Sequence, residues 1–277
     1  MNVQDKQNKA SVWTWLWFAL GAFYFILPLY ATLDFSLRMQ RDTLSFLAYV
    51  KALGDPEFVQ SFVFSSCIAV VTIFAGFFII IPTAYWIRLR LPNARRIVEF
   101  LTLMPFVVPA IILVFGLIRI YGSPLKIPFT DIVLIQPLTN SSVGTNLLLV
   151  AGYVILAMPY LYRSVDTGLR AMDVRSLTEA AQSLGANWLT VMIKIILPNL
   201  RAALLSGALL TFAIVVGEVT LASFLSRPAF GPYLWLLGQH KAYEPAALSF
   251  ASFLLTWIAM GIIQLLTGEQ GQSAGTH

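Results

Sequence analysis

Six long apolar segments constrain the fold of this 277-residue chain more than any other feature of its sequence. A helix needs about 20 apolar residues to cross the hydrocarbon core of a bilayer. That core offers no partner for free backbone N–H and C=O groups, so a crossing segment of this kind must be helical. We expect spans at residues 13–33, 62–86, 99–121, 146–162, 202–225 and 245–266. The predicted fold is an all-α membrane protein with a bundle of six transmembrane helices, the fourth of which is shortened by a break or kink at Pro159.

Composition supports a membrane location. Only 11% of the residues are charged and 58% are hydrophobic, whereas about a quarter of the residues of soluble domains are charged. The first apolar run is longer than the core of a signal peptide, so we expect it to be retained. We predict a polar N-terminal tail (1–12), a single transmembrane domain (13–266) and a C-terminal tail (267–277).

The distribution of basic residues predicts the orientation. With the N-terminus inside, eleven of the 18 Lys and Arg residues fall on the inner side. The short loop RLRLPNARR (88–96) alone carries four arginines, and short loops set topology. Both tails are therefore expected on the cytoplasmic side.

Several kinds of chemistry are excluded by what the sequence lacks. Cys67 is the only cysteine, and the two histidines, His240 and His277, are far apart, so no metal-ligand spacing occurs. No nucleophile–base cluster suggests an enzyme, and no basic surface interleaved with aromatic residues suggests nucleic-acid binding. A membrane subunit without catalytic residues remains, and a secondary transporter working alone is the competing class, although six spans barely supply its two halves.

A partly polar segment, EAAQSLGANWLTVMIKIILP, lies in the long predicted cytoplasmic loop 163–201. Asp173 and Asn187 are typical helix N-caps, and a glycine such as Gly185 commonly ends a helix in the left-handed conformation. Pro198 marks a break before the next span. The predicted apolar stripes of the two helices are Leu177, Ala180, Ala181 and Leu184, and then Trp188, Val191, Met192 and Ile195.

Such a helix–turn–helix has two plausible uses. Its apolar side can lie on the lipid headgroups, or it can enter a groove on a partner protein. The small side chains of Ala180 and Ala181 favour a protein partner, because they let another backbone approach closely.

The segment resembles the EAA signature of permease subunits in bacterial type I ABC importers. The matching positions are Glu179, Ala180, Ala181, Gly185, Ile195, Leu197 and Pro198. The resemblance implies that this loop holds a coupling helix, which docks on an ATP-hydrolysing subunit and converts ATP-driven closure into alternating access. The chain has no G-x-x-x-x-G-K-[ST] phosphate loop, in agreement with such a division of labour.

The resemblance also implies partners. We expect two ATP-binding cassette subunits holding ATP and Mg²⁺, a second and different permease chain, and a periplasmic or lipid-anchored solute-binding protein. The permease itself would bind no cofactor and would lie in the bacterial inner membrane as a multi-pass protein, in contact with lipid and not with nucleic acid.

Four residues inside the predicted spans are candidates for the substrate path. Glu218 is an intramembrane carboxylate, which normally faces a cavity or a partner. Arg119 is its expected partner, although it could instead extend to the interface. Pro105 and Pro109 would bend the third span, either to line a cavity or simply for packing.

The substrate is the least constrained property. The layout and the stretch GEVTLASFLS (217–226) resemble the spermidine/putrescine importer branch and its relatives for ferric iron, thiamine and aminophosphonates. We expect a polyamine or related amino compound, with those other solutes as alternatives. Glu218 would suit a cation, but acidic residues at this place also resemble those in branches that move anions.

Overall fold

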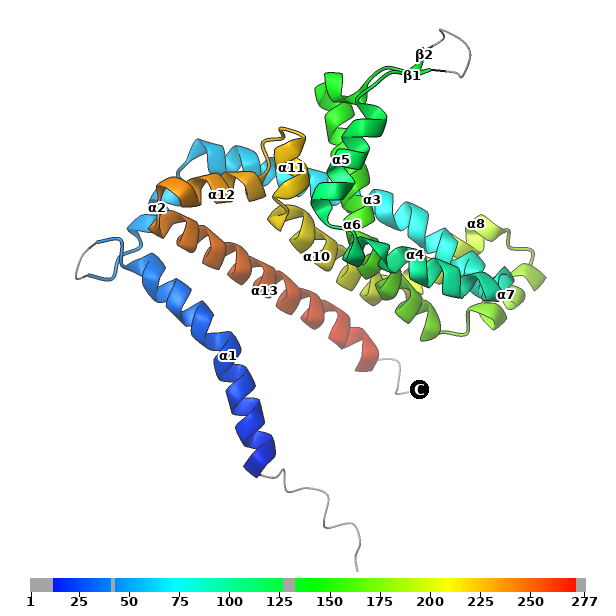
Figure 1. Ribbon diagram of the computed structural model, residues 1–277. Helices are drawn as coiled ribbons and strands as arrows, with labels where there is room; N and C mark the ends of the chain where they lie inside the picture. Colours follow the sequence, from blue (N-terminus) through cyan, green and yellow to red (C-terminus); the bar gives the residue numbers. More distant parts are fainter. Residues whose placement is uncertain (1–11, 41–42, 127–132, 273–277) are drawn as a thin grey trace, which may run out of the picture. The chain divides into compact units, whose positions relative to one another are not determined.

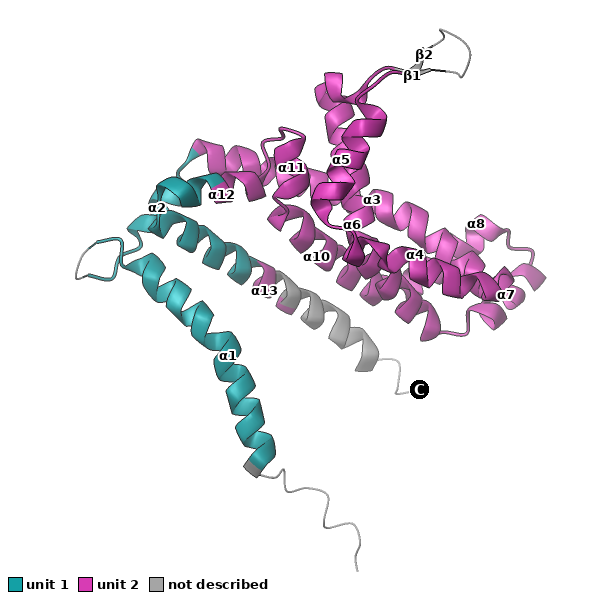
Figure 2. Cartoon of the chain, viewed as in Figure 1, with its two compact units in different colours: residues 1–55, 236–255 teal, residues 56–235, 256–277 magenta. Residues whose placement is uncertain are grey.

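The structure is a computed structural model that describes residues 12–40, 43–126 and 133–272. The described residues are mostly helical (Figure 1), as the apolar segments predict. They form two compact units (Figure 2), residues 1–55 with 236–255 and residues 56–235 with 256–277. The predicted tail 1–12 and the residues after 272 lie almost entirely outside the described part.

The first unit contains α1 (Val12–Leu37), the short helix α2 (Leu47–Leu53) and the first part of α13 (Tyr243–Gln272). Ser36 and Tyr49 share a hydrogen bond of 2.8 Å, which ties α1 to α2. The rings of Phe35 and Tyr243 stack with centroids 4.8 Å apart. Helix α13 continues to Gln272, past the predicted end of the last span at 266.

Three long helices form the centre of the second unit: α3 (Pro56–Arg90), α6 (Ser142–Arg170) and α10 (Arg201–Gly217) pack against one another (Figure 1). Glycines allow them to approach closely. A Cβ at Gly76 of α3 would overlap Leu161 of α6, and one at Gly207 of α10 would lie 3.1 Å from Ser164 of α6. Small residues at such contacts are typical of helix pairs in membranes, where packing replaces the hydrophobic effect.

The predicted third span is two helices. Helix α4 (Arg95–Val107) and helix α5 (Ala110–Tyr121) meet at an angle of 102°. The break lies at Pro109, whose ring forces the preceding residue, Val108, into an extended conformation with ψ 114°. Pro105 stays inside α4, so the bend predicted for this span occurs at Pro109 and not at Pro105.

The fourth predicted span is longer than expected. Helix α6 passes through the buried Pro159 and ends only at Arg170, so the loop predicted to start at residue 163 starts at 171. A proline removes one backbone donor, and packed membrane helices tolerate that loss. The helix is capped by Ser141, whose side chain accepts a hydrogen bond from the Gly144 N–H group at 3.0 Å.

The segment 122–145, between the third and fourth predicted spans, contains two short antiparallel strands. Its strands are β1 (Leu125–Lys126) and β2 (Val133–Ile135), followed by the 3-10 turn η3 (Leu138–Asn140). Another 3-10 turn, η2 (Pro92–Ala94), connects α3 to α4 within the arginine-rich loop.

The predicted fifth span is also interrupted. Helix α10 ends at Gly217, and the short helix α11 (Thr220–Phe224) follows after an extended Glu218. Helix α12 (Phe230–His240) leads to α13. Within the described part, three helices are long and apolar enough to span a membrane, and two bent helix pairs raise the number to five if each counts as one span. The sixth predicted span falls in α13, whose side chains are described as far as Ile258.

Candidate functional site

The signature segment folds as the predicted helix–turn–helix. Helix α7 (Val174–Ser183) is capped by Asp173, whose carboxylate accepts a hydrogen bond from the Ser176 N–H group at 3.2 Å. Gly185 has φ +82°, the left-handed conformation expected of a glycine that ends a helix. Helix α8 (Trp188–Val191) is capped by Asn187, which accepts from the Thr190 N–H group at 2.8 Å.

The second half of the segment departs from a regular α-helix. After α8 comes a π-helical turn, η4 (Met192–Ile196), and then the single turn α9 (Leu197–Asn199). The chain next bends by 76° into α10. Pro198 stands in the first turn of α9, so the break that it predicts falls just after it, at Leu200.

The face that α7 buries differs from the predicted stripe. The helix buries Val174, Thr178 and Ala181 in a core formed with α3, α6 and the η4 turn. Of the four predicted stripe residues only Ala181 is buried, whereas Leu184 is 89% exposed. The reason is that Thr178 is hydrogen-bonded inside the core, so a polar side chain occupies a position that apolar periodicity alone would assign to solvent.

The other predicted stripe residues instead form an exposed apolar face on α7. It consists of Leu177, Ala180 and Leu184, at the i, i+3, i+7 spacing that places side chains on one side of a helix. Glu179 is also exposed and pairs with Arg175 at 2.8 Å on the helix surface. This face of α7 is therefore not covered by other described residues of the chain.

Two contacts join the segment to the C-terminal end of α3. The Tyr85 hydroxyl lies 3.1 Å from the Thr178 hydroxyl, and both are buried. The next residue, Trp86, stacks on Trp188 of α8 with ring centroids 6.0 Å apart and planes at 23°. The guanidinium of Arg90 lies 5.9 Å above the Trp86 ring.

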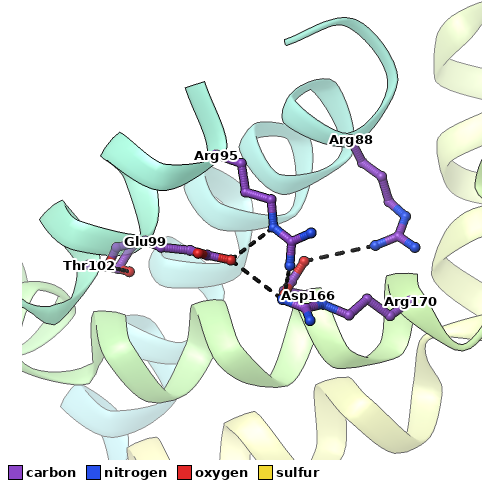
Figure 3. Close-up of polar contacts among 6 residues, drawn as sticks. All are labelled: Arg88, Arg95, Glu99, Thr102, Asp166 and Arg170. Atoms are coloured by element: carbon purple, nitrogen blue, oxygen red, sulfur yellow. Dashed lines mark hydrogen bonds and ion pairs between the residues drawn. The ribbon is translucent and has the colours of Figure 1, made fainter. Parts of the chain in front are cut away.

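An ion-pair cluster lies at the C-terminal ends of α3 and α6 and the N-terminal end of α4 (Figure 3). Asp166 of α6 contacts Arg170 at 2.5 Å, Arg95 of α4 at 3.4 Å and Arg88 of α3 at 4.0 Å. Glu99 accepts hydrogen bonds from Arg95 at 2.8 Å and from Arg170 at 3.4 Å. One carboxylate thus joins the ends of three helices.

Two cavities meet at this cluster. One, of about 710 Å³, lies between the ends of α3 and α6 and the start of α7, and Arg88, Asp166 and Arg175 line it. The other, of about 880 Å³, lies between α4, α6 and the start of α10, and Phe106, Tyr160, Asp166 and Leu210 are among its lining residues. The cluster therefore stands where a movement of these helices would change both spaces.

Hydrogen bonds shift the pKa values of two charged groups on α7, outside the helix bundle. Hydrogen bonds from the Ser176 hydroxyl and amide hold the pKa of Asp173 below its ordinary value. The hydrogen bond to Glu179 raises the pKa of Arg175. Both groups remain ionised at neutral pH, as the cap of α7 requires.

Glu218 does not pair with Arg119 as predicted. Its carboxylate accepts hydrogen bonds from the Thr220 N–H group at 2.6 Å and from the Leu221 N–H group at 2.9 Å, at the N-terminus of α11. Arg119 is exposed on α5, and no ion pair joins it to Glu218 within the described residues. A carboxylate finds compensation in these backbone dipoles, so it needs no arginine there. The other two candidates are prolines: Pro109 lies at the α4–α5 bend and Pro105 lies within α4. Both are distant from the signature segment in the sequence.

Sequence reasoning missed Tyr85 and Thr178, which join the segment to α3. It also missed Glu99 and Asp166, which join the neighbouring helix ends through arginines. The acidic pair had a detectable signal. Arg95–Glu99 and Asp166–Arg170 are both spaced i, i+4, the spacing of helical ion pairs. The hydroxyl pair had none, because its members are separated by 93 positions.

Comparison with known proteins identifies this arrangement. Residues 92–268, which include the signature segment and the broken helices, match the family described as binding-protein-dependent transport system inner membrane component. The chain belongs to this family. It is 31% identical over 189 residues to a probable molybdenum ABC transporter permease protein of Haloferax volcanii, covering 67% of this chain and 66% of the relative.

The chain is also similar to the spermidine/putrescine transport system permease protein PotC of Haemophilus influenzae. It is 38% identical over 82 residues, which are 30% of this chain and 32% of the relative. The chain therefore matches less than two thirds of the length of either relative. Among solved structures, a bacterial ABC transporter involved in the import of the acidic polysaccharide alginate has the same fold, with TM-score 0.64 and 16% identity over 95% of this chain and 96% of the other.

Proposed function

We propose that this chain is the transmembrane permease subunit of an ABC importer, and that residues 173–200 couple it to a separate ATPase. The observation that carries the proposal is the exposed apolar face of α7 (Leu177, Ala180 and Leu184), which the EAA signature positions beside the exposed Glu179. Exposed apolar side chains at helical spacing fit a groove on a partner protein. Family membership supports this assignment.

The same proposal extends to the assembly. Two ATP-binding cassette subunits would bind ATP and Mg²⁺ and hydrolyse the nucleotide, while this chain and a second permease would enclose the substrate path. A solute-binding protein would deliver the solute at the opposite side of a bacterial inner membrane. This chain would have no catalytic residue of its own, in keeping with its lack of a phosphate loop.

Substitution of the exposed face tests the coupling assignment. In complexes purified from native membranes through a tag on this chain, Leu184→Asp should reduce the recovered ATPase at least about tenfold, because it would place a charge in a desolvated contact. Val143→Asp is the matched control, since Val143 is 79% exposed at the other end of α6 from the segment. Full retention of the ATPase by Leu184→Asp, or ATP-independent transport by this chain alone, would contradict the proposal.

For the solute we propose a polyamine or a related amino compound, because one relative is a spermidine/putrescine permease. Ferric iron, thiamine and aminophosphonates are the alternatives. One relative is named for molybdenum, and a transporter of the same fold is named for alginate, so permeases of this fold serve chemically different solutes. The engagement of the Glu218 carboxylate by α11 means that cation selection would need another group.

The solute assignment is tested by calorimetric titration of the solute-binding protein that delivers solute to this permease. The titrants are spermidine, putrescine, thiamine and molybdate. Tight binding of a polyamine alone supports the proposal. Binding of any of the others in its place refutes the polyamine assignment and leaves the permease assignment intact.

A further inference from the structure

Two buried hydroxyl groups join α7 to α3 in a directional way. Tyr85 is 1% exposed and Thr178 is 4% exposed. The Thr178 hydroxyl donates to the carbonyl of Val174, one turn earlier in α7, at 2.6 Å. Because a threonine hydroxyl carries one hydrogen, the Tyr85 hydroxyl must be the donor in the 3.1 Å contact between the two side chains. The chain of donors therefore runs from α3 into the backbone of α7.

The surroundings of this pair are apolar. Tyr85 belongs to the same buried cluster as Val174 and Ala181 of α7 and Ile196 of η4. A hydroxyl that loses its partner in such surroundings loses free energy, because no water is there to replace the partner. Sliding of α7 along α3 would separate the two hydroxyls and is opposed for that reason.

The neighbouring residue of α3 holds the other half of the segment. Trp86 stacks on Trp188 at the start of α8, so consecutive residues of α3 contact both helices of the helix–turn–helix. Helix α7 presents its exposed apolar face (Leu177, Ala180 and Leu184) on a different side from Thr178. A partner bound to that face leaves the attachment to α3 undisturbed.

We propose that Tyr85 and Thr178 are positioning residues for coupling: their buried hydrogen bond fixes α7 to α3, so that a displacement of α7 by the ATPase moves α3. The inference rests on the proposed function, since it requires an ATPase that displaces α7. A hydroxyl pair that only satisfied two buried groups would affect stability, but it would not determine whether movement of α7 reaches α3.

Hydrogen exchange separates these roles. The complex of this chain with its ATPase, in lipid nanodiscs, is compared without nucleotide and after trapping with Mg-ATP and orthovanadate. Exchange is followed in peptides from α7 (174–183) and from the end of α3 (80–90). The variants are Thr178→Val and Tyr85→Phe, which keep the shape but remove the bond, and Thr178→Ser, which keeps the hydroxyl. Thr211→Val is the matched control, because Thr211 is a buried threonine that bonds the Gly207 carbonyl of its own helix.

In the wild type, trapping should change exchange in both peptides. In Thr178→Val and Tyr85→Phe the change in α7 should persist, while the change in α3 should fall roughly fivefold or more, the factor that matches loss of a typical hydrogen bond. Thr178→Ser and Thr211→Val should behave as the wild type. The double variant should fall no further than either single variant, because both remove the same bond.

A wild-type response of α3 in both Thr178→Val and Tyr85→Phe would overturn the inference, as would a wild type in which trapping leaves α3 unchanged. Failure of the wild-type chain to retain any ATPase would refute the proposed function and this inference together. Retention of the ATPase by all variants, with an unaltered α3 response, would refute this inference alone.

Discussion

Replacing Asp166 with asparagine tests whether its carboxylate fastens three helix ends. The Asp166 side chain is 15% exposed, and the arginines that it contacts are 32%, 38% and 52% exposed. Exposed ion pairs contribute about 0.2–1 kcal/mol each, and breaking a buried pair costs about 3–5 kcal/mol. The Asp166 cluster lies between these limits, because its carboxylate is mostly buried and its guanidinium groups are not. We therefore expect Asp166→Asn to reduce the free energy of unfolding by about 2 kcal/mol after allowance for solvent screening.

For a chain of this size, 1 kcal/mol corresponds to about 2–4 °C in Tm, so Tm should fall by about 4–8 °C. Tryptophan fluorescence during heating of the purified chain in detergent provides the measurement. Asp34→Asn is the control, because Asp34 forms an exposed i, i+4 pair with Arg38 on α1. Raising the salt concentration should narrow the difference between wild type and Asp166→Asn, since salt screens charges. If Asp166→Asn melted at the same temperature as Asp34→Asn, the cluster would not fasten the helices.

Three further changes probe the packing, the turn and the cap. Gly168→Val should destabilise the chain by about 1–3 kcal/mol in the same thermal assay, because a side chain there would overlap its neighbours. Gly116→Val, with nothing within 4 Å, should have little effect, and equal losses would contradict this reading. Gly185→Ala should cost about 1 kcal/mol, because alanine disfavours φ +82°; faster hydrogen exchange in residues 183–190 would show it, and unchanged exchange would oppose it. The pKa of Asp173 is lowered from 3.8 by Ser176, so its cap should be complete above pH 3.8 and be lost as the pH falls further. Hydrogen exchange in the first turn of α7 measures the loss of this cap. Faster exchange that already begins near neutral pH would contradict the prediction.

The sequence predicts the helical class well, because long apolar runs leave few alternatives in a bilayer. It predicts interruptions less well. Pro109 breaks the third span, yet Pro105 and Pro159 lie within helices. Whether a proline breaks a helix depends on the packing of its neighbours, which local sequence does not contain. The break at Glu218 has no proline at all.

The signature segment shows the same division. Local hydrogen bonds decide its caps and its left-handed glycine, and the short-range pattern around Asp173, Gly185 and Asn187 predicts them correctly. The buried face of α7 depends on Thr178, whose partner Tyr85 lies in another helix. The predicted partner of Glu218, Arg119, is wrong for a similar reason. A nearby helix N-terminus can replace an arginine as the partner of a carboxylate, and no residue spacing predicts this contact.

The π-helical turn η4 has a consequence for the length of the segment. A π turn arises where a helix accommodates one extra residue without losing its register on either side. Deleting a single residue between 192 and 196 would let the turn relax to an α-helix and would leave the residues on either side in register. Inserting a residue there would instead rotate everything before it by about 100° relative to α10. The exposed apolar face of α7 would then point elsewhere, although every residue of that face was intact. The number of residues between Gly185 and Ile195 is thus as much a part of the site as their identity, and this stretch should tolerate substitutions, or a single deletion within the π turn, far better than insertions.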